Sequence, residues 1–403
     1  MDAPASRDRR ITTLDGALLS PSRIGDVNRS RVLQALCDHG PLSRAELAKM
    51  AGVTRATIGN IANALIDTGL LEEHEPPKAG AVGKPARPLW FTPGAGLSAA
   101  AAITAGAFDV ALIDARGEVL DASSGQFDAA AKTDGELRDK LIGALDAVMP
   151  TGASALLGIG VAIPGVCDTE RGVILGSGQV PGLRGRGLVQ ALTERFEQRV
   201  LVDNDARVQA LGEKWFGVGR GVPSFASVQT GHGIGVGVVL DGVVYRGPRG
   251  EAGELGHTAV TLDGELCSCG LVGCWETIAS LRWLQREATT RGIDNAAGLD
   301  ASQLVTAARD SAAASALLDE YADHLAIGLA NLVHVLTPSM FIIHGDVVGG
   351  GEELRQRIEN AVRARVLPYL RDDVRIVLSD LDQRAGLVGA AALVLSETFR
   401  LIS

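Results

Sequence analysis

Four side chains of the types that bind soft metal ions lie close together near residue 270. They have the spacing H-x9-C-x-C-x4-C and are His257, Cys267, Cys269 and Cys274. Three thiolates and one imidazole form a complete four-coordinate set for Zn²⁺, which leaves no position for water. The pattern therefore predicts a structural zinc site, and Gly270 and Gly273 would let the chain turn tightly around it. The alternative is a group of buried reduced thiols beside a chance histidine.

A second group of polar residues follows a short predicted strand at 200–203. Because clefts in α/β folds form at the carboxyl ends of strands, Asn204 and Asp205 would lie at the edge of such a cleft. Carboxylates and amides pair well with hydroxyl groups, which suits a sugar. The candidate sugar-binding residues are Asn204, Asp205, Glu254, His257 and Glu276. Two alternatives stay open: Asp205 as a helix N-cap, and Glu276 as a solvated residue in the first turn of a helix.

The first part of the chain predicts two short helices joined by a tight turn. Residues 28–71 have a helical pattern without a strand-like run. Ser43, with an acidic residue three positions later, has the spacing of a capping box, and Gly52 ends the helix that it opens. Thr54 is a good N-cap for the next helix, whose apolar stripe is Ile58, Ile61 and Leu65. This arrangement is typical of the helix-turn-helix, whose second helix enters the DNA major groove.

Polar residues of these helices, and a lysine in the segment after them, are the candidate DNA contacts. Arginine can bind guanine and asparagine can bind adenine, while lysine on a hairpin-like wing can contact phosphate. The candidates are Ser43, Arg44, Thr54, Arg55, Thr57, Asn60 and Lys84. Residues 1–95 carry 12 basic and 10 acidic side chains, but the whole chain has a net charge of −10, so nucleic acid is expected only at this end. The alternative is an ordinary three-helix packing module.

The rest of the chain predicts an α/β body, because strand-like and helical segments alternate beyond residue 97. A body of about 300 residues is long for one core, so two lobes with a cleft are expected. Within it we expect two helices in 314–336, besides strands at 156–163 and 340–344 and helices at 135–148, 206–216 and 386–399.

Composition excludes several classes of protein. The chain of 403 residues has no uncharged apolar stretch of membrane-spanning length and no apolar segment typical of a secretory signal near its start. We therefore expect a cytoplasmic protein that does not enter a membrane. Only 15 residues are aromatic, which argues against a stacking platform for single-stranded nucleic acid.

The motifs together resemble the ROK family of repressors and sugar kinases. Residues 41–60 read PLSRAELAKMAGVTRATIGN and are followed by a GKP wing at 83–85. This part of the chain is similar to the winged helix-turn-helix of ROK repressors. The sequence ELGH at 254–257 matches the family's ExGH motif, and CSCGLVGCWE at 267–276 matches its CxCGxxGCxE motif.

The resemblance implies a two-lobed fold of the actin/hexokinase type behind a winged helix-turn-helix. Residues 1–24 are expected to form a flexible arm, and the resemblance adds a DNA-binding domain at 25–93 and a sugar-binding domain at 97–403. The first lobe would be 97–203 with the C-terminal helix, and the second 204–385 with the zinc site at 257–274. It also implies operator DNA as partner, a sugar or sugar phosphate as effector, and a homodimer or homotetramer. In the kinases of the family, the residue matching Asp205 is the base that deprotonates the attacked hydroxyl.

The phosphate-binding turns favour a regulator over an enzyme. The second turn of the kinases survives in part as TGHGIGVG at 230–237. The first turn, DxGGT in the kinases, is replaced by AITAGAF at 102–108. Because phosphoryl transfer depends on positioning the phosphates, losing one turn should cost several orders of magnitude in rate. We therefore expect a sugar-responsive transcriptional regulator in which Asp205 is a vestigial base. The alternatives are an ATP-dependent sugar kinase with a DNA-binding appendage, and a zinc-stabilised scaffold without a ligand.

Overall fold

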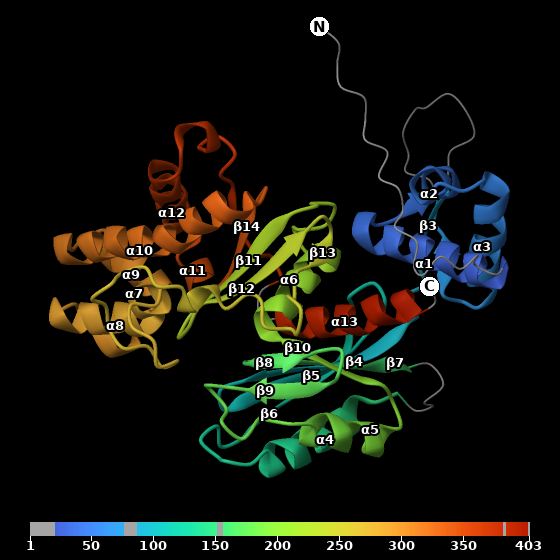
Figure 1. Ribbon diagram of the computed structural model, residues 1–403, viewed down its shortest axis with the longest axis horizontal. Coiled ribbons are helices and arrows are strands. Elements are labelled where there is room, and N and C mark those ends of the chain that lie inside the picture. The colour runs from blue at the N-terminus through green and yellow to red at the C-terminus, as the bar shows by residue number, and fades with distance from the viewer. Residues whose placement is uncertain (1–20, 76–86, 151–155, 382–383, 402–403) are drawn as a thin grey trace, which may run out of the picture.

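A computed structural model describes residues 21–75, 87–150, 156–381 and 384–401. Three parts follow one another along the chain: a small N-terminal domain and the two lobes of a larger body (Figure 1). The expected fold class, a winged helix-turn-helix before a two-lobed α/β body, is confirmed. Among the described residues, no helix is long and apolar enough to span a membrane.

The N-terminal domain consists of three helices and a three-stranded sheet. Strand β3 lies between β1 and β2 and pairs antiparallel with both, so β2 and β3 form the wing. The buried residues Ile58, Ala62 and Leu65 form the packed stripe of α3, and Ile61 packs against this core while half-buried. The elements are α1 (Pro21–His39), β1 (Leu42–Ser43), α2 (Arg44–Ala51), α3 (Arg55–Asp67), β2 (Leu71–Glu73) and β3 (Pro88–Phe91).

Two boundaries of this domain differ from the predictions. Helix α1 begins at Pro21, inside the segment expected as a flexible arm, because proline is favourable in the first turn of a helix. The two-residue strand β1 interrupts a region predicted to lack strands, since its backbone pairs with β3. The predicted wing residues 83–85, with Lys84, lie outside the described residues.

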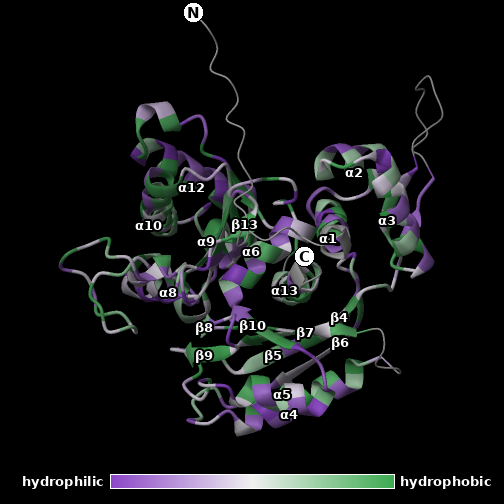
Figure 2. Cartoon of the chain, turned by 45° about the vertical axis from the view of Figure 1, so that its right-hand side comes forward, coloured by the Kyte–Doolittle hydropathy of each residue, from purple (hydrophilic) through white to green (hydrophobic). Residues whose placement is uncertain are grey.

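The first lobe is a five-stranded mixed sheet with the strand order β10-β7-β4-β5-β6. Helices α4 and α5 cover one face and carry hydrophobic and hydrophilic residues side by side (Figure 2). A small hairpin, β8–β9, lies beside β10. The elements are β4 (Leu97–Thr104), β5 (Ala107–Ile113), β6 (Val119–Gln126), α4 (Gly135–Val148), β7 (Leu156–Ile163), β8 (Val166–Asp168), β9 (Val173–Gly176), α5 (Gly187–Phe196) and β10 (Val200–Asn204).

The second lobe is a five-stranded sheet with the order β13-β12-β11-β14-β15, packed against a helical layer. The elements are β11 (Phe225–Thr230), β12 (Gly235–Leu240), β13 (Val243–Val244), the 3-10 turn η2 (Leu255–His257), α7 (Glu276–Ala279), α8 (Leu281–Thr290), η3 (Ala296–Gly298), α9 (Ala301–Ala307), α10 (Ala312–Leu336), β14 (Phe341–Gly345), α11 (Asp346–Gly349), α12 (Gly351–Arg365), η4 (Pro368–Leu370) and β15 (Ile376–Leu378).

One prediction in this lobe is wrong. Residues 314–336 form a single continuous helix, α10, rather than two helices. The glycine within it, Gly328, does not break it; a Cβ there would lie 2.2 Å from the ring of Trp275, so glycine allows that ring to pack against the helix. The helix ends only at Thr337, which has a left-handed backbone and precedes a proline.

Two helices lie between the sheets of the body. Helix α13 (Ala385–Leu401) packs on β4 and β7 of the first lobe, and α6 (Asp205–Phe216) packs on β11 and β12 of the second. The two helices contact each other closely: a Cβ at Gly389 of α13 would lie 2.1 Å from the carbonyl oxygen of Val208 in α6. Helix α6 therefore contacts both lobes, and its first residues lie between them (Figure 1).

Candidate functional site

The side chain of Asn204 holds the start of α6. Its Oδ1 accepts hydrogen bonds from the backbone amides of Ala206 (3.1 Å) and Arg207 (3.2 Å), and its Nδ2 donates to the carbonyl of Gly165 (3.0 Å). Asn204 is thus the N-cap, a role that the sequence had left open for Asp205. The cap fixes the direction in which the next residue, Asp205, leaves the end of β10.

Asp205 is a half-buried carboxyl group with an altered acidity. Its pKa is raised to about 6, chiefly by burial; a hydrogen bond from the amide of Ala206 (2.9 Å) opposes the rise, and the charge of Glu254 adds to it. Such a group is mostly ionised at neutral pH and accepts hydrogen bonds. Because it is partly removed from water, its charged form is destabilised until a polar ligand binds to it.

The other candidate sugar-binding residues lie on the second lobe and reach one another. Nε2 of His257 lies 3.9 Å from Oε2 of Glu254, and Nδ1 lies 3.7 Å from Oε1 of Glu276. On the side of α6, Arg207 donates to the carbonyl of Ala252 (2.8 Å), two residues before Glu254, and the charge of Glu254 contributes to the raised pKa of Asp205. The structure therefore brings all five predicted residues to one region between the lobes. The side chain of Asn204 is already engaged there as the N-cap at the start of α6.

The three cysteines and His257 form one cluster. Their ligand atoms all lie within 4.8 Å of one another, with Sγ of Cys269 3.7 Å from Sγ of Cys274 and Sγ of Cys267 3.5 Å from Nδ1 of His257. This set could hold a metal ion. The thiol of Cys267 also lies 3.0 Å from Glu276, so the cluster adjoins the candidate sugar-binding residues directly.

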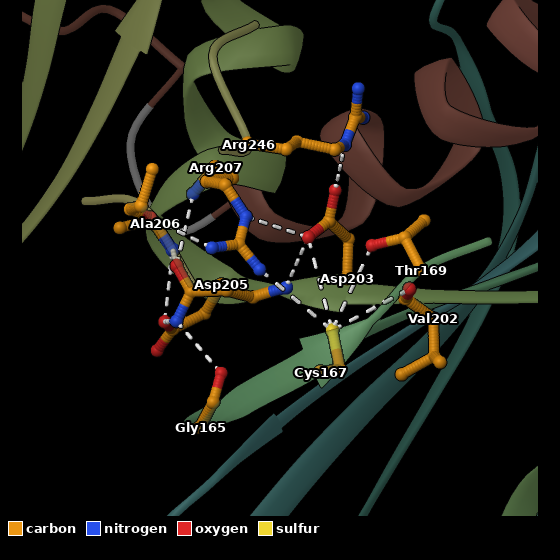
Figure 3. Close-up of polar contacts among 11 residues, drawn as sticks. Gly165, Cys167, Thr169, Val202, Asp203, Asp205, Ala206, Arg207 and Arg246 are labelled. Atoms are coloured by element: carbon orange, nitrogen blue, oxygen red, sulfur yellow. Dashed lines mark hydrogen bonds and ion pairs between the residues drawn. The ribbon is translucent and has the colours of Figure 1, made fainter. Parts of the chain in front are cut away.

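A buried charge network behind Asp205 was not predicted from the sequence. Asp203, at the end of β10, accepts hydrogen bonds from Arg207 (2.8 Å) on α6 and Arg246 (2.6 Å) on the second lobe (Figure 3). Burial opposes the charge of Asp203, but the two guanidinium groups outweigh it and hold its pKa below the usual value. No signal in the sequence indicated this network, because an arginine in a predicted helix is ordinarily a surface residue.

Arg207 also reaches the loop that carries Glu254. Its Nη1 donates to the carbonyl of Ala252 (2.8 Å), and its Nη2 lies 3.8 Å from the thiol of Cys167 on β8. The guanidinium is 1% exposed, so its donors depend on these partners. One side chain therefore ties the first turn of α6 to elements of both lobes.

The partly retained glycine-rich turn lies against a carboxyl group. Thr230, at the end of β11, donates to the carbonyl of His344 (2.6 Å) and accepts from the amide of Val347 (3.1 Å), which holds the turn against α11. Asp346 begins α11 and accepts from Tyr321 (3.1 Å). Asp346 follows Gly345, which pairs with Thr230, and burial raises the pKa of Asp346, while hydrogen bonds from the amide of Ala301 (3.1 Å) and from Tyr321 oppose this rise.

The candidate DNA contacts divide into two sets. Ser43 forms the predicted capping box, and Arg44 is bound to Glu73 of the wing (2.8 Å) and to Asn63 (2.9 Å). Thr54 caps α3 and contacts Thr57 (2.9 Å). Arg55 and Asn60, by contrast, are exposed on α3 and have no polar side-chain partner among the described residues.

Comparison with known proteins gives separate matches for the N-terminal domain and for the two-lobed body. A model of the ROK family matches residues 100–397, and a model of the MarR family matches residues 26–80. The chain is 30% identical to a putative xylose repressor from Caldicellulosiruptor sp. (strain Rt8B.4) over 395 residues, which cover 93% of this chain and 96% of the relative.

Solved structures with a similar fold include a regulator and a kinase. One is a ROK family transcriptional regulator described as a homologue of the Escherichia coli MLC protein, with a TM-score of 0.77, 26% identity and coverage of 94% of this chain and 98% of that one. The other is a ROK family glucokinase from Streptomyces griseus in complex with glucose and AMPPNP, with a TM-score of 0.64, 28% identity and coverage of 73% and 98%. The regulator is similar over both domains, and the glucokinase over about three quarters of this chain.

Proposed function

This chain belongs to the ROK family, and we propose that it is a transcriptional repressor whose affinity for operator DNA changes when a sugar binds between its lobes. The observation that carries the proposal is the combination, in one chain, of a winged helix-turn-helix with the complete set of candidate sugar-binding residues. The similarity to a putative xylose repressor over both domains supports it.

The sugar would bind to polar groups that come from both lobes. Asp205 and Asn204 belong to the end of β10 and the start of α6, while Glu254, His257 and Glu276 belong to the second lobe. A ligand that hydrogen-bonds to both sets stabilises one arrangement of the lobes over others. If that arrangement spaces two DNA-binding domains differently, DNA affinity changes by linkage. This requires a homodimer or homotetramer, which we also propose, and an operator with two related half-sites.

We assign Zn²⁺ to the His/Cys cluster. With Zn–S bonds of about 2.3 Å, the sulfur atoms of a tetrahedral site lie roughly 3.8 Å apart, close to the separation of Cys269 and Cys274. His257 would bind the metal through Nδ1, which faces Cys267, and Nε2 would stay available for a hydroxyl group on the side of Glu254. The ion would fix the ring and the loop at 267–274.

DNA would be contacted by the exposed face of α3 and by the wing. Arg55 and Asn60 are suited to base edges, since neither is engaged in a polar contact inside the described part of the domain. Ser43 and Arg44, also predicted contacts, have structural partners, so we expect their main contribution to be the stability of α2 and of the wing. Thr54 and Thr57 start α3, where phosphate contacts are favourable.

The second candidate function is an ATP-dependent sugar kinase, favoured by the similarity to a glucokinase. Two features oppose it. The β4–β5 hairpin turns at Ala105 and Gly106, without the acidic residue and paired glycines of the kinases. Asp346 places a carboxyl group beside the remaining glycine-rich turn, where it would repel a phosphate when ionised.

A thermal-shift screen with glucose, xylose, N-acetylglucosamine and their phosphates, each with and without MgATP, tests this assignment. A sugar at 100 times its Kd should add about 2.7 kcal/mol to the free energy of unfolding. A shift that is independent of MgATP and accompanied by altered DNA binding supports the repressor. A shift that decays as ADP accumulates would support the kinase instead.

A further inference from the structure

Helix α6 connects the candidate sugar site to the DNA-binding domain. It begins with Asp205 and ends with Phe216, and nine of its twelve residues are buried. At 1.5 Å per residue, about 14 Å separate Asp205 from Lys214 along the helix axis. The helix packs on β11, β12 and α13, so its interior has no room to bend independently of the body.

The first turn of α6 is held by the network around Asp203. Figure 3 shows Arg207 and Arg246 converging on the carboxylate of Asp203, with Asp205 beside them in the same first turn of α6 as Arg207. Because Arg207 also binds the carbonyl of Ala252, two residues before Glu254, the position of the loop and the position of the helix are linked by one side chain. A ligand that draws Glu254 toward Asp205 therefore acts on the start of α6.

The last turn of α6 contacts the DNA-binding domain through polar side chains. The ammonium group of Lys214 donates a hydrogen bond to the carboxylate of Asp38 on α1, and Nε1 of Trp215 donates to the same oxygen (3.1 Å). The side chain of Lys214 is 7% exposed, so the carboxylate of Asp38 compensates an ammonium group that is largely removed from water. On α1, Gln34 donates to the same carboxylate (2.9 Å), which fixes its orientation.

Aromatic contacts surround this ion pair. The guanidinium of Arg220 lies over the ring of Trp90 on β3 and donates to the carbonyl of Trp215 (2.7 Å). Phe399 of α13 stacks on Phe91 of β3 and on Trp215. The DNA-binding domain is therefore seated on the ends of α6 and α13 rather than tethered only by the chain at 92–96.

We propose that α6 transmits sugar binding to the DNA-binding domain, with Lys214 and Trp215 as the residues that position α1 through Asp38. This inference rests on the proposed function and names the route by which the site regulates DNA affinity. A shift at the first turn moves the packed helix as a unit, so α1 must follow it or lose the partly buried ion pair between Lys214 and Asp38. The orientation of the DNA-binding domain, and with it the spacing of two such domains in an oligomer, changes accordingly.

The test measures a coupling ratio in the full-length protein: the Kd for DNA with saturating sugar divided by the Kd without it. The DNA is the duplex that the protein selects from a random-sequence pool, and the sugar is whichever of glucose, xylose, N-acetylglucosamine or their phosphates binds by calorimetry. Allosteric coupling is typically about 5- to 150-fold. We expect Lys214→Met and Asp38→Asn each to reduce the ratio to less than about one third of the wild-type value, with a change of less than about three-fold in sugar Kd.

Two further variants separate coupling from folding. Trp215→Phe removes one hydrogen bond to Asp38 and leaves a smaller aromatic ring in place of the indole, so it should lower the ratio even if Lys214→Met does not fold. Asp146→Asn breaks an ion pair with Arg195 (2.6 Å) between α4 and α5, far from α1, and should leave the ratio unchanged. Because Asp38 and Lys214 form one contact, the double variant should match the single variants.

The outcomes separate this inference from the proposed function. If sugar alters DNA binding in the wild type and in Trp215→Phe and Asp38→Asn alike, the sugar acts by another route and the inference is overturned. If sugar binds to the wild type without altering its DNA affinity, the proposed function fails, and the inference fails with it. A lower ratio in Asp146→Asn, equal to that in Asp38→Asn, would also overturn the role of α6.

Discussion

Nε2 of His257 lies 3.9 Å from Oε2 of Glu254, while the other ring nitrogen of His257 faces the thiol of Cys267. One imidazole thus stands between the metal-binding cluster and the candidate sugar site. This arrangement makes the two sites dependent on each other, because an ion on Nδ1 would fix both the ring orientation and the tautomer.

Removal of the metal should therefore weaken both folding and sugar binding. We expect Cys274→Ser, which replaces a buried ligand, to lose bound zinc and to unfold roughly 10 °C below the wild type. Metal content is measured by mass spectrometry and unfolding by calorimetry. Cys167→Ser, at a buried cysteine outside the cluster, is the control for zinc content, which should not change. Unchanged sugar affinity in zinc-free, folded protein would contradict the dependence.

Asp205→Asn should stabilise the protein without ligand and weaken sugar binding. The carboxyl pKa is raised from 3.8 to about 6, so the folded state is penalised for ionising this group when the pH is above both values. The penalty is at most about 3 kcal/mol at pH 7 and disappears as the pH falls through 6 toward 3.8. We expect the variant to unfold at a higher temperature than the wild type at pH 7, with a smaller difference at pH 5. Equal unfolding temperatures at pH 7 would contradict a desolvated carboxylate.

Arg55→Ala should weaken DNA binding without changing the stability of the domain. Arg55 is exposed on α3, and a lost contact to a base edge costs about 1–3 kcal/mol, or roughly 5- to 150-fold in Kd. Fluorescence anisotropy with the selected duplex measures the change. The control is Arg171→Ala, at an arginine 77% exposed on the first lobe, which should bind DNA normally. Equal affinities for the two variants would remove Arg55 from the DNA interface.

The protein should not release ADP when a sugar and MgATP are both present. The β4–β5 turn has no acidic residue, and Asp346 stands beside the other glycine-rich turn. A coupled ADP assay, with a ROK glucokinase as positive control, measures the rate. Sugar-dependent turnover faster than about 1 per second, typical of kinases, would contradict the assignment as a regulator.

Local patterns in the sequence predict the elements that depend on nearby residues. Gly135–Val148 and Leu156–Ile163 have the predicted bounds, and the capping box at Ser43 is present. The cysteine cluster is also predictable, because its ligands lie within 18 residues of one another. The single helix α10 was not, because Gly328 weakens the helical pattern and only the packing of Trp275 shows why a glycine is tolerated there.

Contacts between distant parts of the chain could not be predicted from the sequence pattern. Asp203 and Arg246 are 43 residues apart, and Asp38 and Lys214 are 176 apart. Each of these residues alone resembles an ordinary surface charge. Only the fold shows that Asp203 and Lys214 are buried, with the half-buried Arg246 and Asp38 as their partners, so the network behind Asp205 and the contact with α1 emerge from the structure alone.

The proposal that a sugar regulates DNA binding is tested most directly by the affinity of the wild-type protein for its selected DNA duplex. This affinity is measured by anisotropy as each sugar and sugar phosphate is titrated. We expect that one of them changes the Kd for DNA by at least about five-fold at saturation, without ATP. We also expect that the same ligand binds more weakly to Asp205→Asn. A ligand whose binding to the wild type depends on Asp205, but which leaves the Kd for DNA unchanged, would contradict regulation of DNA binding by a sugar.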